Sequence, residues 1–294
     1  MSWIIFSILA AFTWAVVNTI DKFILTKWIR NPVLPLIVLG FIGLLASIII
    51  FFLHGFSFLS LPNILLGICS GLFYSLMSMF YFKAAKIEEI SRVVPLFYLA
   101  PLFVLILASI LINESFEKIN YLGIFLLVVG ALLISSRNLV RIRFGKAFWL
   151  MILSSLSLAI NQVITKYLLG YSDFWTVFSW TRIGMFISLI PIYFTGIPDL
   201  QSTVRQHGKR VFGLISLSQC LNLLGVVFIT IAISKGHVTL VNSLSSIQPL
   251  LVLIIVVLLS IFNPNILKEE FNKSNLTVKF IAILLIFCGA IIVS

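Results

Sequence analysis

The chain has 294 residues, of which 61% are hydrophobic and only 10% charged, and its formal net charge is +11. Soluble domains carry about a quarter charged residues, so this chain cannot cover a water-exposed surface, and two soluble domains are excluded. The positive charge alone would suit a nucleic-acid-binding protein. The composition instead indicates a helical membrane protein, and we expect no nucleic-acid partner.

Apolar stretches follow one another along nearly the whole chain, and each is close to the roughly 20 residues that a spanning helix needs. We predict ten transmembrane helices. In chain order they cover residues 3–20, 33–53, 61–82, 93–112, 120–136, 147–165, 174–194, 211–234, 238–262 and 276–293. Because the stretches are rich in Leu, Ile and Phe without strict alternation, we expect helices and not a β-barrel. The first stretch lacks a basic leader and an Ala-x-Ala site, so it is not expected to be a cleaved signal.

The second half of the chain repeats the first, and such repeats decide the fold. Pro101-Leu-Phe-Val-Leu-Ile returns as Pro249-Leu-Leu-Val-Leu-Ile, and the same ungapped alignment pairs Phe80 with Phe228. Two further matches pair Lys22-Phe-Ile-Leu with Lys166-Tyr-Leu-Leu, and Gly130-Ala-Leu-Leu-Ile-Ser with Gly289-Ala-Ile-Ile-Val-Ser. Each copy holds five predicted helices, an odd number, so the copies must cross the membrane in opposite directions.

The predicted organisation is therefore an all-α membrane protein with two inverted-topology five-helix repeats. Residues 1–136 form the first repeat, 137–146 a basic connecting loop and 147–294 the second repeat. Transporters built in this way place their site between the two halves and expose it alternately to each side.

Positive charge is distributed unevenly between the predicted loops. Sixteen of the 20 Lys and Arg residues fall in loops after odd-numbered helices, and three in loops after even-numbered ones. The positive-inside rule then predicts cytoplasmic odd-numbered loops, with both termini outside, in the cytoplasmic (inner) membrane. The basic loops would also contact anionic lipids.

A series of short motifs runs in order along the first half. They are Trp14-Ala, Tyr81-Phe-Lys-Ala-Ala85, Pro95, Pro101-Leu-Phe-Val, Asn113-Glu114, Tyr121-Leu-Gly-Ile and Gly130-Ala-Leu-Leu-Ile. With their duplication they resemble the EamA-type branch of the drug/metabolite transporter superfamily. The resemblance implies ten helices in two inverted bundles around a central cavity, and transport of small solutes. The second half departs from the pattern, because its expected acid is displaced to Glu269-Glu270. Many members have cytoplasmic termini, which also differs from the orientation predicted here.

Arg182 is the most conspicuous polar residue, since it falls near the middle of the predicted helix 174–194. Charged residues within the bilayer are costly and usually have a specific role. A guanidinium cannot shed its charge, so it needs a carboxylate, carbonyls or water. Two interpretations remain open: a cavity cation that binds an anionic substrate or closes a gate, and a fixed link between helices.

Other polar or aromatic side chains occupy single faces of predicted helices and are candidates to line the cavity. They are Trp14, Asn18, Tyr74, Tyr98, Asn161, Gln219, Asn222, Asn242 and Gln248. Close helix packing with interhelical hydrogen bonds explains such stripes equally well. Pro101 and Pro249 occupy equivalent places and are candidate hinges, because each frees a carbonyl and kinks its helix; simple shape-fitting is the alternative.

The acidic residues all fall at predicted helix ends or in loops. Proton-coupled carriers keep a titratable carboxylate at the site, so a central proton relay is not expected. Asp21 would be the exception if the first helix ran further than residue 20. We otherwise expect Asp21 to pair locally with Lys22 or with loop charges.

The favoured function is a secondary transporter for a small polar or amphipathic metabolite, working by alternating access as a monomer or homodimer. A flippase for a lipid-linked substrate and a non-transporting receptor or scaffold are the alternatives. An enzyme is not expected: Glu88-Glu-Ile-Ser-Arg92 resembles the motif of intramembrane CAAX-type proteases, but no membrane His partners accompany it. The dispersed Cys and His residues suggest neither a metal site nor a cofactor.

Overall fold

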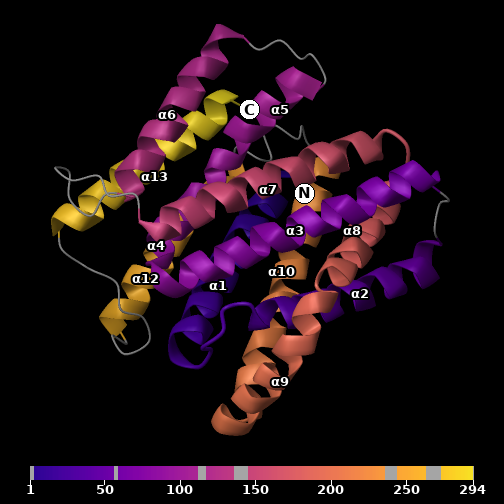
Figure 1. The fold of residues 1–294 in the computed structure, drawn as a ribbon. Coiled ribbons are helices and arrows are strands. Elements are labelled where there is room, and N and C mark those ends of the chain that lie inside the picture. Colours follow the sequence, from indigo (N-terminus) through magenta and orange to yellow (C-terminus); the bar gives the residue numbers. More distant parts are fainter. Residues whose placement is uncertain are drawn as a thin grey trace.

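The computed structural model describes residues 3–55, 59–111, 117–135, 145–235, 244–262 and 273–293, and every regular element in these ranges is a helix. Figure 1 shows the helices packed into one bundle. Their bounds are α1 (Trp3–Lys27), α2 (Leu34–His54), α3 (Leu61–Ile87), α4 (Ile90–Val93), the 3₁₀ helix η1 (Val94–Leu99), α5 (Ala100–Leu111), α6 (Lys118–Ser135), α7 (Lys146–Leu169), α8 (Phe174–Ser188), α9 (Ile190–His207), α10 (Lys209–Lys235), α12 (Gln248–Phe262) and α13 (Lys273–Val293).

The protein is an integral membrane protein by the length and composition of its helices. Five helices are long and apolar enough to cross a membrane: α1, α2, α3, α7 and α10 up to Ala232. A sixth span results if the bent pair of α8 and α9 is counted as one. Four apolar helices are shorter: Ile90–Val104, Lys118–Ile134, Gln248–Phe262 and Leu276–Ile292. Large apolar side chains such as Phe52 and Phe194 are exposed, as contact with lipid requires.

The helices α1 and α3 extend beyond their predicted ends at residues 20 and 82, because the lysines near those ends find partners. Lys22 Nζ donates hydrogen bonds to the carbonyls of Ala85 (2.8 Å) and Glu88 (2.6 Å) at the end of α3. Lys86 Nζ in turn donates to the carbonyls of Leu25 and Ile29 at the end of α1. Each lysine thus binds carbonyls that lack a helical partner, where a cation also suits the helix dipole.

The single helix predicted over residues 174–194 is wrong in its extent. The chain bends by 68° between α8, which ends at Ser188, and α9, which begins at Ile190. Pro191 explains the break, because it has no N–H for the preceding turn and its ring collides with the carbonyl four residues earlier. In Figure 1, α9 extends beyond the bundle at its lower end.

The helices α6 and α13 lie side by side (Figure 1) and cross at glycines. A Cβ atom on Gly130 would come within 2.9 Å of the Ala282 carbonyl and 2.6 Å of the Ile286 side chain. A Cβ atom on Gly289 would come within 2.7 Å of the Gly123 carbonyl and 2.8 Å of the Leu127 nitrogen. Small residues at a membrane crossing allow two backbones to approach closely.

Two further pairs of helices join distant parts of the chain. In one pair α1 packs against α10, and in the other α7 packs against α3. The residue numbers in contact rise along one helix of each pair and fall along the other, so both pairs are antiparallel. For example, Asp21 meets Ser218 while Trp14 lies against Gly225.

Candidate functional site

Arg182 lies between two aromatic rings near the middle of α8. Its guanidinium carbon is 4.2 Å from the centroid of the Tyr74 ring, on α3, and 4.8 Å from that of Phe178, one turn away on α8. Both distances are within the range of a cation–π interaction. The side chain is only 5% exposed.

No anion compensates the charge of Arg182 within the part of the chain that the structure describes. Neither a salt bridge nor a hydrogen bond of Arg182 occurs there, and its buried Nε has no hydrogen-bond partner. Aromatic ring faces attract a cation but accept no N–H hydrogen bond as strong as that of a carboxylate. The arrangement therefore holds the guanidinium between two rings and leaves its Nε without a hydrogen-bond acceptor among the described residues.

Glycines position Arg182 by bringing three helices together. A Cβ atom on Gly71 of α3 would overlap the backbone of Thr181 and Met185, and one on Gly184 of α8 would overlap the backbone of Ile68. On the opposite side, a Cβ atom on Gly43 of α2 would lie 3.3 Å from Cδ of Arg182. The close crossing of α3 and α8 is what brings Tyr74 within reach of the guanidinium.

A second polar group occupies the interface of α1 and α10. Asn18 accepts a hydrogen bond from the Tyr81 hydroxyl at 2.9 Å, and Ser218 donates to the Asp21 carboxylate at 2.6 Å. The amide nitrogens of Asn18 and Gln219 are buried and have no hydrogen-bond partner among the described residues. On the same helices, Trp14 lies against Gly225, and Asn222 is half-buried without a hydrogen bond to another described residue.

Asp21 does not pair with Lys22, which was the preferred expectation. Since α1 continues to Lys27, Asp21 lies inside the helix and is only 3% exposed. Successive helical residues point in different directions, and Lys22 is directed to the end of α3. The expectation that every acid lies outside the helices therefore fails at Asp21.

The amide of Asn161 takes part in helix packing between α7 and α3. Its Nδ2 donates to the Ser70 carbonyl (3.0 Å) and to the Ser70 hydroxyl (2.8 Å). The Ser70 hydroxyl also lies 3.2 Å from that of Thr165. Buried amide groups are nearly always hydrogen-bonded, and here Ser70 of α3 accepts the hydrogen bonds of the Asn161 amide on α7.

Tyr98 joins η1 to the start of α12. Its hydroxyl lies 2.8 Å from the Ser245 carbonyl and 3.0 Å from Oε1 of Gln248. Pro249 is buried in the first turn of α12, after a turn at Ser246 and Ile247, while Pro101 follows η1 at the start of α5. The side chain of Pro101, the candidate Asn242 and residues 137–144 of the connecting loop lie outside the described residues.

Sequence reasoning missed a buried ionic group at the end of α3, because its members were assigned to loops. Glu89 Oε2 lies 2.7 Å from Lys279 Nζ of α13 and 2.9 Å from Arg92 Nε. Arg92 also donates to the Ile134 carbonyl of α6 at 2.9 Å. The spacing of Glu89 and Arg92 in one helical turn was the available signal, but nothing in the sequence pointed to Lys279.

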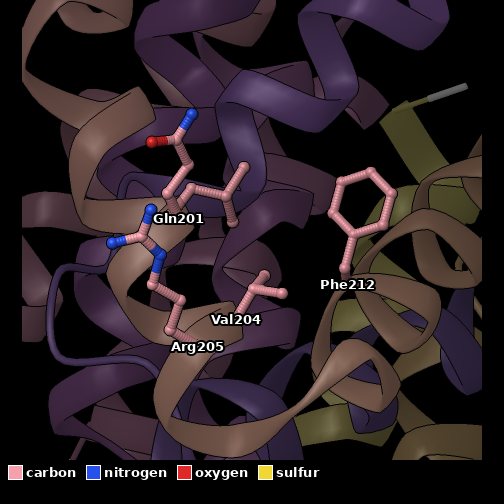
Figure 2. A pocket seen from close by; sticks show the side chains of 5 residues that line it. Gln201, Val204, Arg205 and Phe212 are labelled. Atoms are coloured by element: carbon pink, nitrogen blue, oxygen red, sulfur yellow. The ribbon is translucent and has the colours of Figure 1, made fainter.

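A pocket of about 300 Å³ lies apart from these groups, where α9 turns into α10. Figure 2 shows Gln201, Val204 and Arg205 from α9 and Phe212 from α10 around it. None of the candidate residues lines it. Among the described residues, no three His, Cys, Asp or Glu side chains come together as a metal site.

Comparison with known proteins finds a family match in the first half of the chain. The model of the EamA-like transporter family matches residues 1–136. The first half of the chain is thus similar to EamA-like transporters. This confirms the resemblance that the motifs indicated.

Two similar proteins extend the comparison. A Bacillus subtilis (strain 168) protein named as the uncharacterized transporter YxxF is 26% identical over 142 residues, which are 47% of this chain. The match spans about half of that relative, 45% of its length. A crystal structure shares the fold with a TM-score of 0.61 and 17% identity, over 99% of this chain and 95% of that one. The similarity of fold to that structure therefore includes both halves of this chain.

Proposed function

We propose that this protein is a secondary transporter of the EamA type that moves a small polar or amphipathic metabolite across the cytoplasmic membrane. The match of residues 1–136 to a transporter family supports the proposal, as does the similarity to a bacterial protein that is itself named a transporter. In this proposal the four shorter apolar helices also cross the membrane, which gives ten spans in two five-helix halves.

An inverted repeat is supported by contacts that occur twice. The sequence alignment of Gly130 with Gly289 also aligns Gly123 with Ala282 and Leu127 with Ile286. Gly130 contacts Ala282 and Ile286, while Gly289 contacts Gly123 and Leu127. Exchanging the two copies therefore reproduces the same contacts, as a two-fold axis within the membrane plane would.

The pairs α1–α10 and α7–α3 support the same symmetry. The alignment of Lys22 with Lys166 pairs Asp21 with Thr165, and that of Phe80 with Phe228 pairs Ser218 with Ser70. Asp21 bonds to Ser218, and Thr165 lies beside Ser70. Each contact joins one half to the other, so the two interfaces are equivalent candidates for the gates of alternating access.

Interruptions in equivalent helices support a site between the halves. The 3₁₀ helix η1 precedes Pro101, and a turn at residues 246–247 precedes Pro249. Tyr98 connects the two interruptions through Ser245 and Gln248. Transporters commonly use such broken helices at the substrate site and as hinges.

Our choice of substrate rests on the surroundings of Arg182, whose guanidinium lies between the rings of Tyr74 and Phe178. A guanidinium held mid-helix, with no anion beside it among the described residues, is suited to a substrate that brings a carboxylate or another anionic group. We therefore propose that the metabolite is anionic or carries a carboxylate, with Tyr74 and Arg182 at its binding site.

Matched ligand pairs test this assignment. Purified protein is screened by thermal shift against small carboxylates, each paired with its carboxamide, and hits are followed by counterflow in proteoliposomes. We expect a carboxylate to stabilise the native protein more than its amide does. Arg182→Gln should weaken binding by about tenfold or more, because a charge-assisted hydrogen bond is lost.

Arg182→Lys is the control, since it keeps the charge but loses the planar donor geometry, and it should bind more weakly than the native protein yet better than Arg182→Gln. Normal abundance of folded Arg182→Gln protein is required for the interpretation. Failure of that variant to fold would show that Arg182 links helices and would remove the proposed substrate contact.

A further inference from the structure

Asp21 is a buried carboxylate that the proposed substrate site does not use. It lies within the first spanning helix, is 3% exposed and contacts the other half of the protein through Ser218. The Tyr81 hydroxyl of α3 lies beside the carboxylate as well. A negative charge in such a position is costly unless a cation or a proton neutralises it.

No cation in the described residues pairs with Asp21. Lys22 and Lys86 are bound to carbonyls at the ends of α3 and α1, and Arg92 of α4 is bound to Glu89. In α10, Ser218 and Gln219 are neutral, and Lys209 and Arg210 lie near its start, while α12 has no titratable residue. The polar groups that contact the carboxylate among the described residues are the hydroxyls of Ser218 and Tyr81.

The equivalent interface shows that packing does not require a carboxylate. Thr165 and Ser70 take the places of Asp21 and Ser218, and two hydroxyls 3.2 Å apart suffice there. At these matched positions, the α1–α10 interface carries a carboxylate, which can take up and release a proton, and the α7–α3 interface carries a hydroxyl.

We propose that Asp21 is a proton-binding site that couples closure of the α1–α10 interface to proton uptake. The inference rests on the proposed function, because it treats this interface as a gate between the halves. A proton from water binds a carboxylate oxygen when the interface is open, and the neutral acid is then buried against Ser218 as the interface closes. Reopening exposes Asp21 to water and releases the proton, so an ionised Asp21 favours the open gate.

A distance measurement tests the coupling without any substrate. Spin labels are placed by Lys27→Cys on α1 and Gly213→Cys on α10, after replacement of Cys69, Cys220 and Cys288 by Ala. Lys27 is exposed, and a side chain at Gly213 would meet open space. Distances are measured by pulsed electron spin resonance in lipid nanodiscs across a range of pH at constant Na⁺. We expect the population with separated labels to grow as the pH rises.

Asp21→Asn and Asp21→Thr should hold the labels in the short-distance population at every pH. Asp21→Thr reproduces the natural Thr165–Ser70 pair, so it should fold as well as the native protein. Identical pH responses in the native protein and in Asp21→Asn would overturn the proposal. A response to Na⁺ at constant pH, without a response to pH, would also overturn it and would indicate a metal-ion site.

Infrared difference spectra give an independent readout on the same proteins. The carbonyl stretch of a protonated carboxylic acid should titrate in the native protein and be missing in Asp21→Asn and Asp21→Thr. Its presence in all three would assign the proton to another acid and overturn the proposal. Neither experiment uses a substrate. The Asp21 proposal can therefore be overturned while carboxylate binding at Arg182 is observed. Conversely, carboxylate binding at Arg182 can be absent while both experiments support proton binding at Asp21.

Discussion

At the scale of single residues, polar side chains within this membrane protein fall into two groups by how their hydrogen bonds are used. The amide nitrogen of Asn161 is used, because it donates to the backbone carbonyl and to the hydroxyl of Ser70. Within the described part of the chain, Asn18 and Gln219 each bury an amide nitrogen that has no hydrogen-bond partner, and Arg182 buries its Nε in the same way. Unsatisfied buried donors are rare, and their presence marks places where a ligand or water is expected.

Removing a satisfied amide should therefore affect stability and leave transport intact. We expect Asn161→Ala to lower the free energy of unfolding by about 1 kcal/mol, the scale of interhelical hydrogen bonds in membranes. Thermal unfolding in detergent measures the loss, and counterflow in proteoliposomes measures transport. Gln162→Ala is the matched control, since Gln162 is its exposed neighbour on α7. Loss of transport at unchanged stability would instead place Asn161 in the substrate path.

At the scale of helices, glycines determine which elements cross and how closely. Gly71 and Gly184 let the backbones of α3 and α8 touch, and this contact brings Tyr74 to Arg182. Lysines act at helix ends, where Lys22 and Lys86 bind the final carbonyls of each other's helices. Small residues inside a helix and cations at its end thus hold α1, α3 and α8 in place.

Gly71→Ala should disrupt the crossing, because the added methyl group overlaps the backbone of Thr181 and Met185. Overpacking of this kind costs about 1–3 kcal/mol. We expect a lower melting temperature and weaker carboxylate binding, since Tyr74 moves away from Arg182. Gly213→Ala on α10 adds a methyl group in open space and should be neutral or slightly stabilising. Equal effects of both substitutions would contradict the close crossing.

At the scale of the whole molecule, the positive charges that predict the orientation in the membrane include several that the structure buries. The buried cations Lys22, Arg92 and Lys279, and Lys86 beside them, belong to the sets that the sequence assigned to odd-numbered loops. The structure binds Lys22 and Lys86 to helix-end carbonyls, and Arg92 and Lys279 to Glu89. Their assignment to one membrane side remains a prediction that rests on the positive-inside rule.

Reporter fusions test that orientation. A reporter inserted in the basic loop of residues 137–146 should score as cytoplasmic, and one beside Tyr171, in the short loop between α7 and α8, should score as external. Tyr171 is well exposed, so the insertion should be tolerated. The reverse pattern would invert the predicted topology and assign the Asp21 gate to the external side.

Much of the helical architecture was predictable because hydropathy is a local property. Apolar stretches located the helices, but their ends depended on distant partners. The first helix was expected to stop at residue 20, since Asp21 and Lys22 are charged. It continues because Lys22 reaches α3 and Asp21 reaches α10. The bend before α9 was missed although Pro191 was visible, because proline is also tolerated within membrane helices.

The candidate site was predictable only in its residue types. Arg182, Tyr74 and Asn18 were selected as costly or polar groups within a bilayer, and this choice needed no contacts. The sequence by itself thus determined the membrane class and which residues require partners, because both follow from composition and local pattern. Only the tertiary structure decided the partners: Tyr74 for Arg182, Ser70 for Asn161 and Ser218 for Asp21. Such contacts join residues far apart in the chain, and packing alone brings them together.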